Sequence, residues 1–332
     1  MIRLTDSPSD LERAASLLRA GALVAFPTET VYGLGADAGN ARAVADVFRA
    51  KGRPPDHPVI VHLPSARALP LWAAEIPDSA RRLAGMFWPG PLTLVLKRAR
   101  DVPDAITGGQ DTVGLRVPGN PTALALLRAF GGALAAPSAN RFGHVSPTTA
   151  DHVVQEFGSE VAAVVDGGRC SVGVESTIVD LSGGLPRLLR PGMIRVDALE
   201  AELGESLVRV DDREGPRASG RLASHYAPAA CLEQVAAGSL SARVDACIQA
   251  GERVAVLARR EPPKAADKVI WIEMPRQPVQ YARALYAELR RADEERPARI
   301  LVESTPESAG WEAISDRLRR ASGGKRKQTK AG

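Results

Sequence analysis

Aromatic residues, paired cysteines and long apolar runs are all scarce in this chain of 332 residues, and each scarcity excludes something. Aromatics are only 4% of the residues, so the core must rest on Ala, Val and Leu, and little is available for stacking nucleic-acid bases. The three cysteines form no CxxC pair, which excludes a zinc site of the usual four-ligand spacing and argues against a disulfide framework. The five histidines are scattered, so we predict no metal ion held by the protein itself.

The chain also lacks the features of a membrane or exported protein. No apolar run is long enough to span a bilayer, and residues 1–6 do not resemble a signal peptide. We therefore expect a cytoplasmic protein. The formal net charge of +4 suits anionic ligands but does not by itself indicate nucleic acid. Part of the excess lies in the basic tail, residues 322–332, which we predict to be disordered; the alternative is an RNA-binding arm.

Apolar patterning predicts helices that alternate with strands, which is typical of an α/β fold with a mixed sheet. We expect a strand-rich first domain over residues 1–208 and a linker over 209–229. A small Rossmann-like α/β domain over 230–321 follows, without a GxGxxG motif that would indicate a dinucleotide. In the first domain, the expected helices are residues 9–19, 41–50 and 121–130, and the expected strands are 22–26, 59–63, 92–97, 113–117, 161–166 and 177–181. In the last domain, the expected strands are 253–257 and 299–302, and the expected helices are 239–250, 280–291 and 311–321.

Two short segments carry groups suited to a phosphate or carboxylate. Lys51 and Arg53 flank Gly52 in a proline-rich loop, where a point charge and a planar fork can face one anion. Ser138 and Asn140 follow an apolar run and can contact phosphate or ribose. The alternative for the first segment is a solvated basic turn.

Arg116 lies on an otherwise apolar strand, where burying a charge without a partner is costly. Its fork suits a carboxylate, and the alternative is an internal salt bridge. Thr28–Gly35 follows a buried strand and predicts a ligand loop, or else a turn that only reverses the chain. No GxSxG elbow or Walker A loop is present, so chemistry by positioning and charge neutralisation is the simplest interpretation.

Seven motifs occur in the order typical of YrdC-like threonylcarbamoyl-AMP synthases, and the chain resembles that family up to residue 321. They are PTETVYGLG, KGRP, the strand with His62, TVGLRVP, APSAN, GVESTIVD and LLRPG. The segment 224–228, SHYAP, and the domain after it resemble the long form of the enzyme. The resemblance implies a twisted open sheet. It also implies a nucleotidyltransferase that combines L-threonine, bicarbonate and ATP with Mg²⁺ into threonylcarbamoyladenylate and pyrophosphate.

The resemblance further implies partners and a set of site residues. A downstream threonylcarbamoyl-transferase complex would modify adenosine 37 of tRNAs that read ANN codons, and weak direct binding of tRNA would be possible. Lys51 and Arg53 would neutralise charge during the reaction, and Tyr226 would come from the linker as a lid. The implied ATP-binding residues are Arg53, His57, Thr112, Ser138, Asn140, Ser146, Arg190 and Tyr226. The implied L-threonine-binding residues are Thr30, His62, Arg116, Ala136 through its backbone, and Ser176.

Two other functions are compatible with parts of the pattern. One is a non-catalytic module for double-stranded RNA, which would leave a buried Arg116 without a purpose. The other is the related carbamoyl-transfer domain of hydrogenase maturation. That protein carries zinc-finger motifs, which three unpaired cysteines exclude here.

Overall fold

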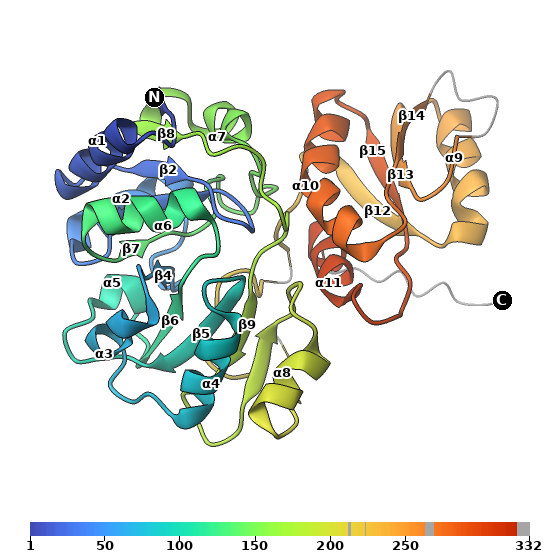
Figure 1. The fold of residues 1–332 in the computed structure, drawn as a ribbon. Coiled ribbons are helices and arrows are strands. Elements are labelled where there is room, and N and C mark those ends of the chain that lie inside the picture. Colours follow the sequence, from blue (N-terminus) through green and yellow to red (C-terminus); the bar gives the residue numbers. More distant parts are fainter. Residues whose placement is uncertain (212–213, 223, 263–268, 324–332) are drawn as a thin grey trace. The chain divides into compact units, whose positions relative to one another are not determined.

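A computed structural model describes residues 1–211, 214–222, 224–262 and 269–323. The chain forms two compact units, which Figure 1 colours along the sequence. The first comprises Met1–Phe142 and Ser146–Arg221, and the second comprises residues from Leu222 onward together with Gly143–Val145. The contacts thus place the segment up to Arg221, most of the predicted linker, in the first unit. From residue 324 onward, the predicted tail lies outside the described residues.

The first unit contains a mixed sheet of 11 strands in the order β1-β8-β2-β3-β7-β4-β6-β5-β9-β10-β11. Parallel and antiparallel neighbours alternate irregularly: β4 and β6 are parallel, for example, whereas β5 and β6 are antiparallel. The strands are β1 (Ile2–Leu4), β2 (Val24–Phe26), β3 (Gly33–Asp37), β4 (Ile60–His62), β5 (Leu92–Lys97), β6 (Thr112–Arg116), β7 (Leu134–Ala135), β8 (Ala163–Val165), β9 (Thr177–Asp180), β10 (Arg187–Arg190) and β11 (Val208–Arg209).

The helices of this unit begin and end where the local sequence satisfies their terminal backbone groups. The Asn40 side chain accepts hydrogen bonds from the first turn of α2, and Gly52, in the left-handed conformation at φ 61°, ends it. Asn120 caps α6 in the same way, and Pro121 occupies its first position. The helices are α1 (Pro8–Arg19), α2 (Ala41–Lys51), α3 (Leu69–Trp72), α4 (Asp78–Phe87), α5 (Asp104–Thr107), α6 (Pro121–Phe130), α7 (Ala150–Phe157) and α8 (Val196–Leu203).

Helices cover the two faces of the sheet unequally. Around β2 and β8, α1 and α6 pack on one face, whereas α2 and α7 pack on the other. Under β5, β6 and β9, the core is closed by α4 and α8. The opposite face of the sheet carries a small apolar cluster of Val95 in β5, Ile178 in β9 and Leu189 in β10, which packs against Val210 and Ala218 from the segment after α8. This face also carries the polar residues described below.

One expectation was wrong in part, because the glycine-rich segment is not wholly a loop. Gly33–Asp37 forms β3, which pairs with β2. A Cβ at Gly35 would lie 2.8 Å from the Phe26 ring and 3.0 Å from the Val24 carbonyl oxygen. Glycine is needed here because the Phe26 ring crosses directly over the neighbouring strand.

The second unit is a parallel sheet of four strands in the order β12-β15-β13-β14. Helix α9 lies on one face and α10 and α11 on the other (Figure 1). Its strands are β12 (Cys231–Val235), β13 (Val254–Ala258), β14 (Val269–Glu273) and β15 (Arg299–Glu303), and its helices are α9 (Leu240–Gln249), α10 (Pro278–Glu294) and α11 (Glu312–Ala321). The predicted mixed α/β sheet followed by a small α/β domain is confirmed. Among the described residues, no helix combines the length and the apolar character needed to cross a membrane.

Candidate active site

Polar side chains gather where five neighbouring strands of the first unit come to one edge of the sheet. The register sets His62 at the end of β4 beside Arg116 at the end of β6. The antiparallel β5 begins at the same edge, and Leu92 there pairs with Thr177 of β9. Strand β10 ends beside them. We call the resulting group the strand-end cluster: His62, Thr93, Arg116, Ser176 and Arg190.

Arg116 is 4% exposed and ion-paired inside the protein. One of its terminal nitrogens, Nη2, lies 2.7 Å from Oε1 of Glu29, and its Nε donates to the Gly90 carbonyl at 3.3 Å. The internal salt bridge that the sequence left open is therefore present. It does not exclude a substrate carboxylate, because a guanidinium has five N–H donors.

His62 lies beside Arg116 as a neutral imidazole. Burial, and secondarily the Arg116 charge, lower the pKa of His62 to about 3. Its ring meets Phe26 edge-on with centroids 6.0 Å apart, and its Nδ1 has no hydrogen-bond partner among the described residues. His62 can therefore exchange hydrogen bonds with a ligand without bringing a second positive charge next to Arg116.

Thr30 and Ala136, two other predicted threonine contacts, are both buried and take part in local hydrogen bonds. The Thr30 hydroxyl is 2.8 Å from that of Thr28, and its carbonyl accepts from the Gly173 amide. The Ala136 amide already donates to the Ile60 carbonyl at 3.0 Å. The backbone N–H of Ala136 is thus committed to the sheet.

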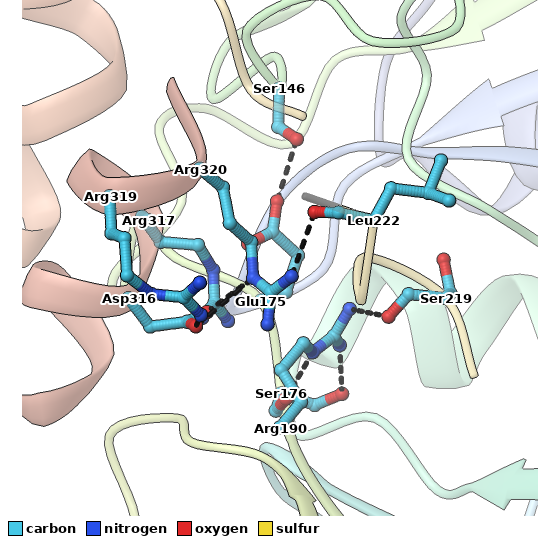
Figure 2. A network of polar contacts seen from close by, with 10 residues as sticks. All are labelled: Ser146, Glu175, Ser176, Arg190, Ser219, Leu222, Asp316, Arg317, Arg319 and Arg320. Carbon is cyan, nitrogen blue, oxygen red and sulfur yellow. Dashed lines mark hydrogen bonds and ion pairs between the residues drawn. The ribbon is translucent and has the colours of Figure 1, made fainter. Parts of the chain in front are cut away.

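Ser176 and Arg190 share one hydrogen-bonded network. Arg190 donates to the Ser176 carbonyl and hydroxyl, each at 3.1 Å, and to the Ser219 carbonyl at 2.8 Å (Figure 2). The Ser176 hydroxyl is also 2.8 Å from that of Thr93. Arg190 thereby joins the edge of the sheet to the segment that follows α8.

Lys51 closes a second group, which we call the loop cluster: Lys51, Arg53, His57, Ser138 and Asn140. Its Nζ donates to the backbone carbonyls of Ser138, at 2.6 Å, and of Asn140. The lysine is 2% exposed, and burial, followed by the nearby Arg53 charge, holds its pKa well below the usual value. Lys51 therefore fixes the 138–140 loop at the end of α2 through its side-chain nitrogen.

Arg53 and His57 flank the ring of Phe142. The Arg53 guanidinium carbon lies 5.9 Å from the ring centroid, and the His57 ring meets Phe142 edge-on at 5.5 Å. Arg53 also donates to the Pro58 carbonyl, which folds its own loop around the guanidinium. Burial, and then the Arg53 charge, lower the pKa of His57, so its ring also favours the neutral form. The loop cluster can therefore offer flat surfaces and a single fork of N–H donors.

The remaining predicted residues lie farther apart. Ser146 is fully buried and donates to Glu175 at 2.6 Å (Figure 2). Thr112 begins β6 while Arg116 ends it, which separates them by about 13 Å along the strand. Tyr226 belongs to the second unit, where it stacks on Tyr286 and holds a positive φ of 62° that is rare for an aromatic residue. Its position toward the other site residues stays a prediction.

The sequence interpretation assigned no role to two buried carboxylates, Glu29 and Glu175, each 7% exposed. Both lie inside motifs that it quoted. The sequence could have indicated both, because Glu29 follows an apolar strand and Glu175 precedes one. A charge in such a place is costly to bury without a partner, which is the argument that singled out Arg116 in the sequence. Among the described residues, no group of three or more His, Cys, Asp and Glu side chains could hold a metal ion.

Comparisons with known proteins identify relatives over nearly the whole chain. A family model described as "Telomere recombination" matches residues 16–192, and one described as "Threonylcarbamoyl-AMP synthase, C-terminal domain" matches residues 194–323. The chain is 41% identical to the threonylcarbamoyl-AMP synthase of Pyrococcus abyssi over 93% of each chain. It is 40% identical to that of Bacillus subtilis over 97% of this chain and 95% of that protein. A crystal structure of the P. abyssi protein complexed with L-threonine is similar with a TM-score of 0.90, 38% identity and coverage of 97% of both chains.

Proposed function

This chain belongs to the family of threonylcarbamoyl-AMP synthases, and from that premise we propose that it joins L-threonine, bicarbonate and ATP into threonylcarbamoyladenylate and releases pyrophosphate. The observation that carries the proposal is the strand-end cluster, in which a buried guanidinium lies beside a neutral imidazole. The likeness to a relative crystallised with L-threonine over nearly its full length supports the same assignment. The reaction would make the chain a nucleotidyltransferase.

In this proposal, the strand-end cluster holds the amino acid. Arg116 takes the carboxylate with the N–H groups that Glu29 and Gly90 leave open, since a charge-assisted fork is a strong contact for a carboxylate. His62 and Ser176 supply neutral hydrogen bonds. Hydrogen bonds in a buried site are electrostatically stronger than the same hydrogen bonds in water, because the local dielectric constant is low.

The loop cluster holds the nucleotide. The carbamate of threonine and the α-phosphate are both anions, so the positive charges of Lys51 and Arg53 lower the cost of bringing them together. We assign Arg53 and His57, which lie beside Phe142, and Thr112, at the far end of β6, to the same nucleotide. Mg²⁺ is expected to arrive with the triphosphate. The described side chains provide no dedicated cluster for it.

The product would pass to a threonylcarbamoyl-transferase complex that modifies adenosine 37 of tRNAs reading ANN codons. Transfer to tRNA, weak direct contact with tRNA and a cytoplasmic location are part of the proposal. An adenylate is a reactive mixed anhydride, so such a product is expected to be consumed soon after it forms.

The experiment that tests the proposed function measures pyrophosphate release from ATP and Mg²⁺, with L-threonine and bicarbonate each supplied or omitted. Release that needs both substrates, with L-serine a poor substitute, is the expected result. Release that ignores threonine would assign another carbamoyl-adenylating reaction. Absence of release under every condition would overturn the proposal in favour of the RNA-binding module.

A further inference from the structure

Glu29 is a buried carboxylate whose oxygens the site leaves unsatisfied. The residue is 7% exposed, and neither Oε1 nor Oε2 accepts a hydrogen bond from a described residue. Among the described residues, it forms an ion pair with Arg116, at 2.7 Å. Burying a carboxylate with so few partners is costly, because the charge loses the hydrogen bonds that water would give.

The backbone around Glu29 fixes where its side chain points. The Glu29 carbonyl accepts from the Val172 amide at 2.7 Å, while the flanking Thr28 and Thr30 hydroxyls bond to each other. The carboxylate lies against Gly119, where a Cβ would come within 3.5 Å of its carboxyl carbon. Glu29 therefore remains at the strand-end cluster instead of swinging toward solvent.

The ion pair of Glu29 and Arg116 is complementary in charge to an α-amino acid. A zwitterion carries a carboxylate and an ammonium on one carbon atom, and Arg116 is the partner proposed above for the carboxylate. The unsatisfied oxygens of Glu29 then face the ammonium, which has three donors to give. The binding of the zwitterion would satisfy every charge in the pair.

We propose that Glu29 is the subsite for the α-ammonium of the amino-acid substrate and the base that takes its proton. The inference rests on the proposed function, whose first bond joins the amine nitrogen to the carbon of bicarbonate. In that step the ammonium gives one proton to Glu29, and the freed lone pair attacks the bicarbonate carbon. A C–O bond then breaks, and its oxygen leaves as water with the hydrogen of bicarbonate and the second amine proton. Ammonium, bicarbonate and carboxylate thus become carbamate, water and the neutral acid, with one negative charge on each side.

Calorimetry without ATP isolates the binding part of the proposal. L-threonine is compared with 2,3-dihydroxybutanoate, in which a hydroxyl replaces the ammonium, on the full chain and on Glu29→Gln. We expect the unaltered protein to prefer threonine by about tenfold or more, and Glu29→Gln to lose that preference while it still binds the analogue through Arg116. An unchanged preference, or an equal loss of both ligands, would overturn the proposal.

Kinetics test the proton transfer. Glu29→Gln should lower pyrophosphate release by about 10²–10⁴-fold, and Glu29→Asp should restore part of it. The residual rate of Glu29→Gln should rise about tenfold per pH unit below the pKa of the threonine amine, because only the unprotonated amine then reacts. A Glu29→Gln enzyme with the rate and pH profile of the unaltered protein would overturn the proposal.

A matched control is Glu303→Gln, which removes another buried glutamate from an ion pair. Glu303 is 8% exposed and lies 3.2 Å from Arg259 in the second unit. Glu303→Gln should leave the rate of pyrophosphate release and the preference for threonine over 2,3-dihydroxybutanoate unchanged. If the unaltered protein neither binds threonine nor releases pyrophosphate, the proposed function is wrong. If the unaltered protein does both and Glu29→Gln gives the same results, the proposed function stands and only the role of Glu29 is wrong.

Discussion

At the scale of single residues, Lys51 shows that a residue of a binding motif can serve the site by shaping it. The sequence predicts a cation beside a phosphate, and in the structure the Lys51 Nζ donates to the carbonyls of Ser138 and Asn140. Residue type and motif order predicted that Lys51 and Asn140 belong together. They could not predict the contact, because every residue has a backbone carbonyl and residue type does not show which carbonyl accepts a hydrogen bond.

Replacing Lys51 by Met therefore tests shape and charge together. We expect a loss of about 1–3 kcal/mol in the free energy of unfolding, because two carbonyls lose their donor, and a loss of most activity. Lys97→Met removes an exposed lysine that is paired with Glu75 and is the control. Urea denaturation and pyrophosphate release measure both effects. A variant as active as the unaltered protein would contradict a role for Lys51 in the site.

His62 makes stability depend on pH. Its pKa is about 3 in the folded protein and about 6.5 when unfolded, so between these values the unfolded chain binds the extra proton. Stability is therefore lost as the pH falls from about 6.5 toward 3, at up to about 1.4 kcal/mol per pH unit from this group. His62→Gln should remove that part of the slope in urea titrations at pH 7, 6 and 5. An identical slope in both proteins would show that His62 is protonated when folded.

At the scale of elements, patterns with a strong local cause were predictable. Helix α6, capped by Asn120 and begun by Pro121, and the apolar strand β5 have the predicted bounds. Strand β3 begins inside the segment Thr28–Gly35, for which the sequence predicts a ligand loop or a turn, because segments rich in threonine and glycine commonly form turns and glycine has a low strand propensity. Its place in the sheet depends on the Phe26 ring above it, a contact between strands that one sequence does not show.

Gly35→Ala tests this reason for β3. The added methyl would meet the Phe26 ring at 2.8 Å, so we expect a loss of about 1–3 kcal/mol in the free energy of unfolding. Gly85→Ala is the matched control, since its Cβ would meet nothing within 4 Å in helix α4. It should be neutral or stabilising by up to about 1 kcal/mol. Thermal denaturation compares the two; equal effects would mean that β3 tolerates a side chain.

At the scale of the whole molecule, the two units have separate apolar cores. The clusters of the first unit contain residues up to 218, and that of the second begins at Val235. A change of composition in the sequence predicted two domains. It could not predict that Gly143–Val145, within the first domain in sequence, makes its contacts with the second unit. The Gly143 carbonyl accepts from the Ala227 amide at 2.8 Å, and the Val145 carbonyl accepts from Arg290.

The segment Gly143–Val145 lies in the sequence between two predicted ATP contacts, Asn140 and Ser146. We therefore expect removal of the second unit to weaken the binding of ATP. A chain ending at Arg221 keeps the cores of the first unit and should fold, and it should still bind L-threonine through the strand-end cluster. Its residues 143–145 lose their backbone partners, so we expect faster amide exchange there and at least about tenfold weaker binding of ATP.

Arg290→Met in the full chain separates this effect from the loss of Tyr226. It removes the donor to the Val145 carbonyl and retains Tyr226, so it should give an intermediate increase in exchange at residues 143–147 and an intermediate loss of ATP affinity. Hydrogen exchange by mass spectrometry and calorimetry measure the two quantities on the same samples. If Arg290→Met binds ATP normally while the shortened chain does not, the hydrogen bond from Arg290 to the Val145 carbonyl does not affect ATP binding. The loss of ATP affinity in the shortened chain would then come from the removed residues themselves.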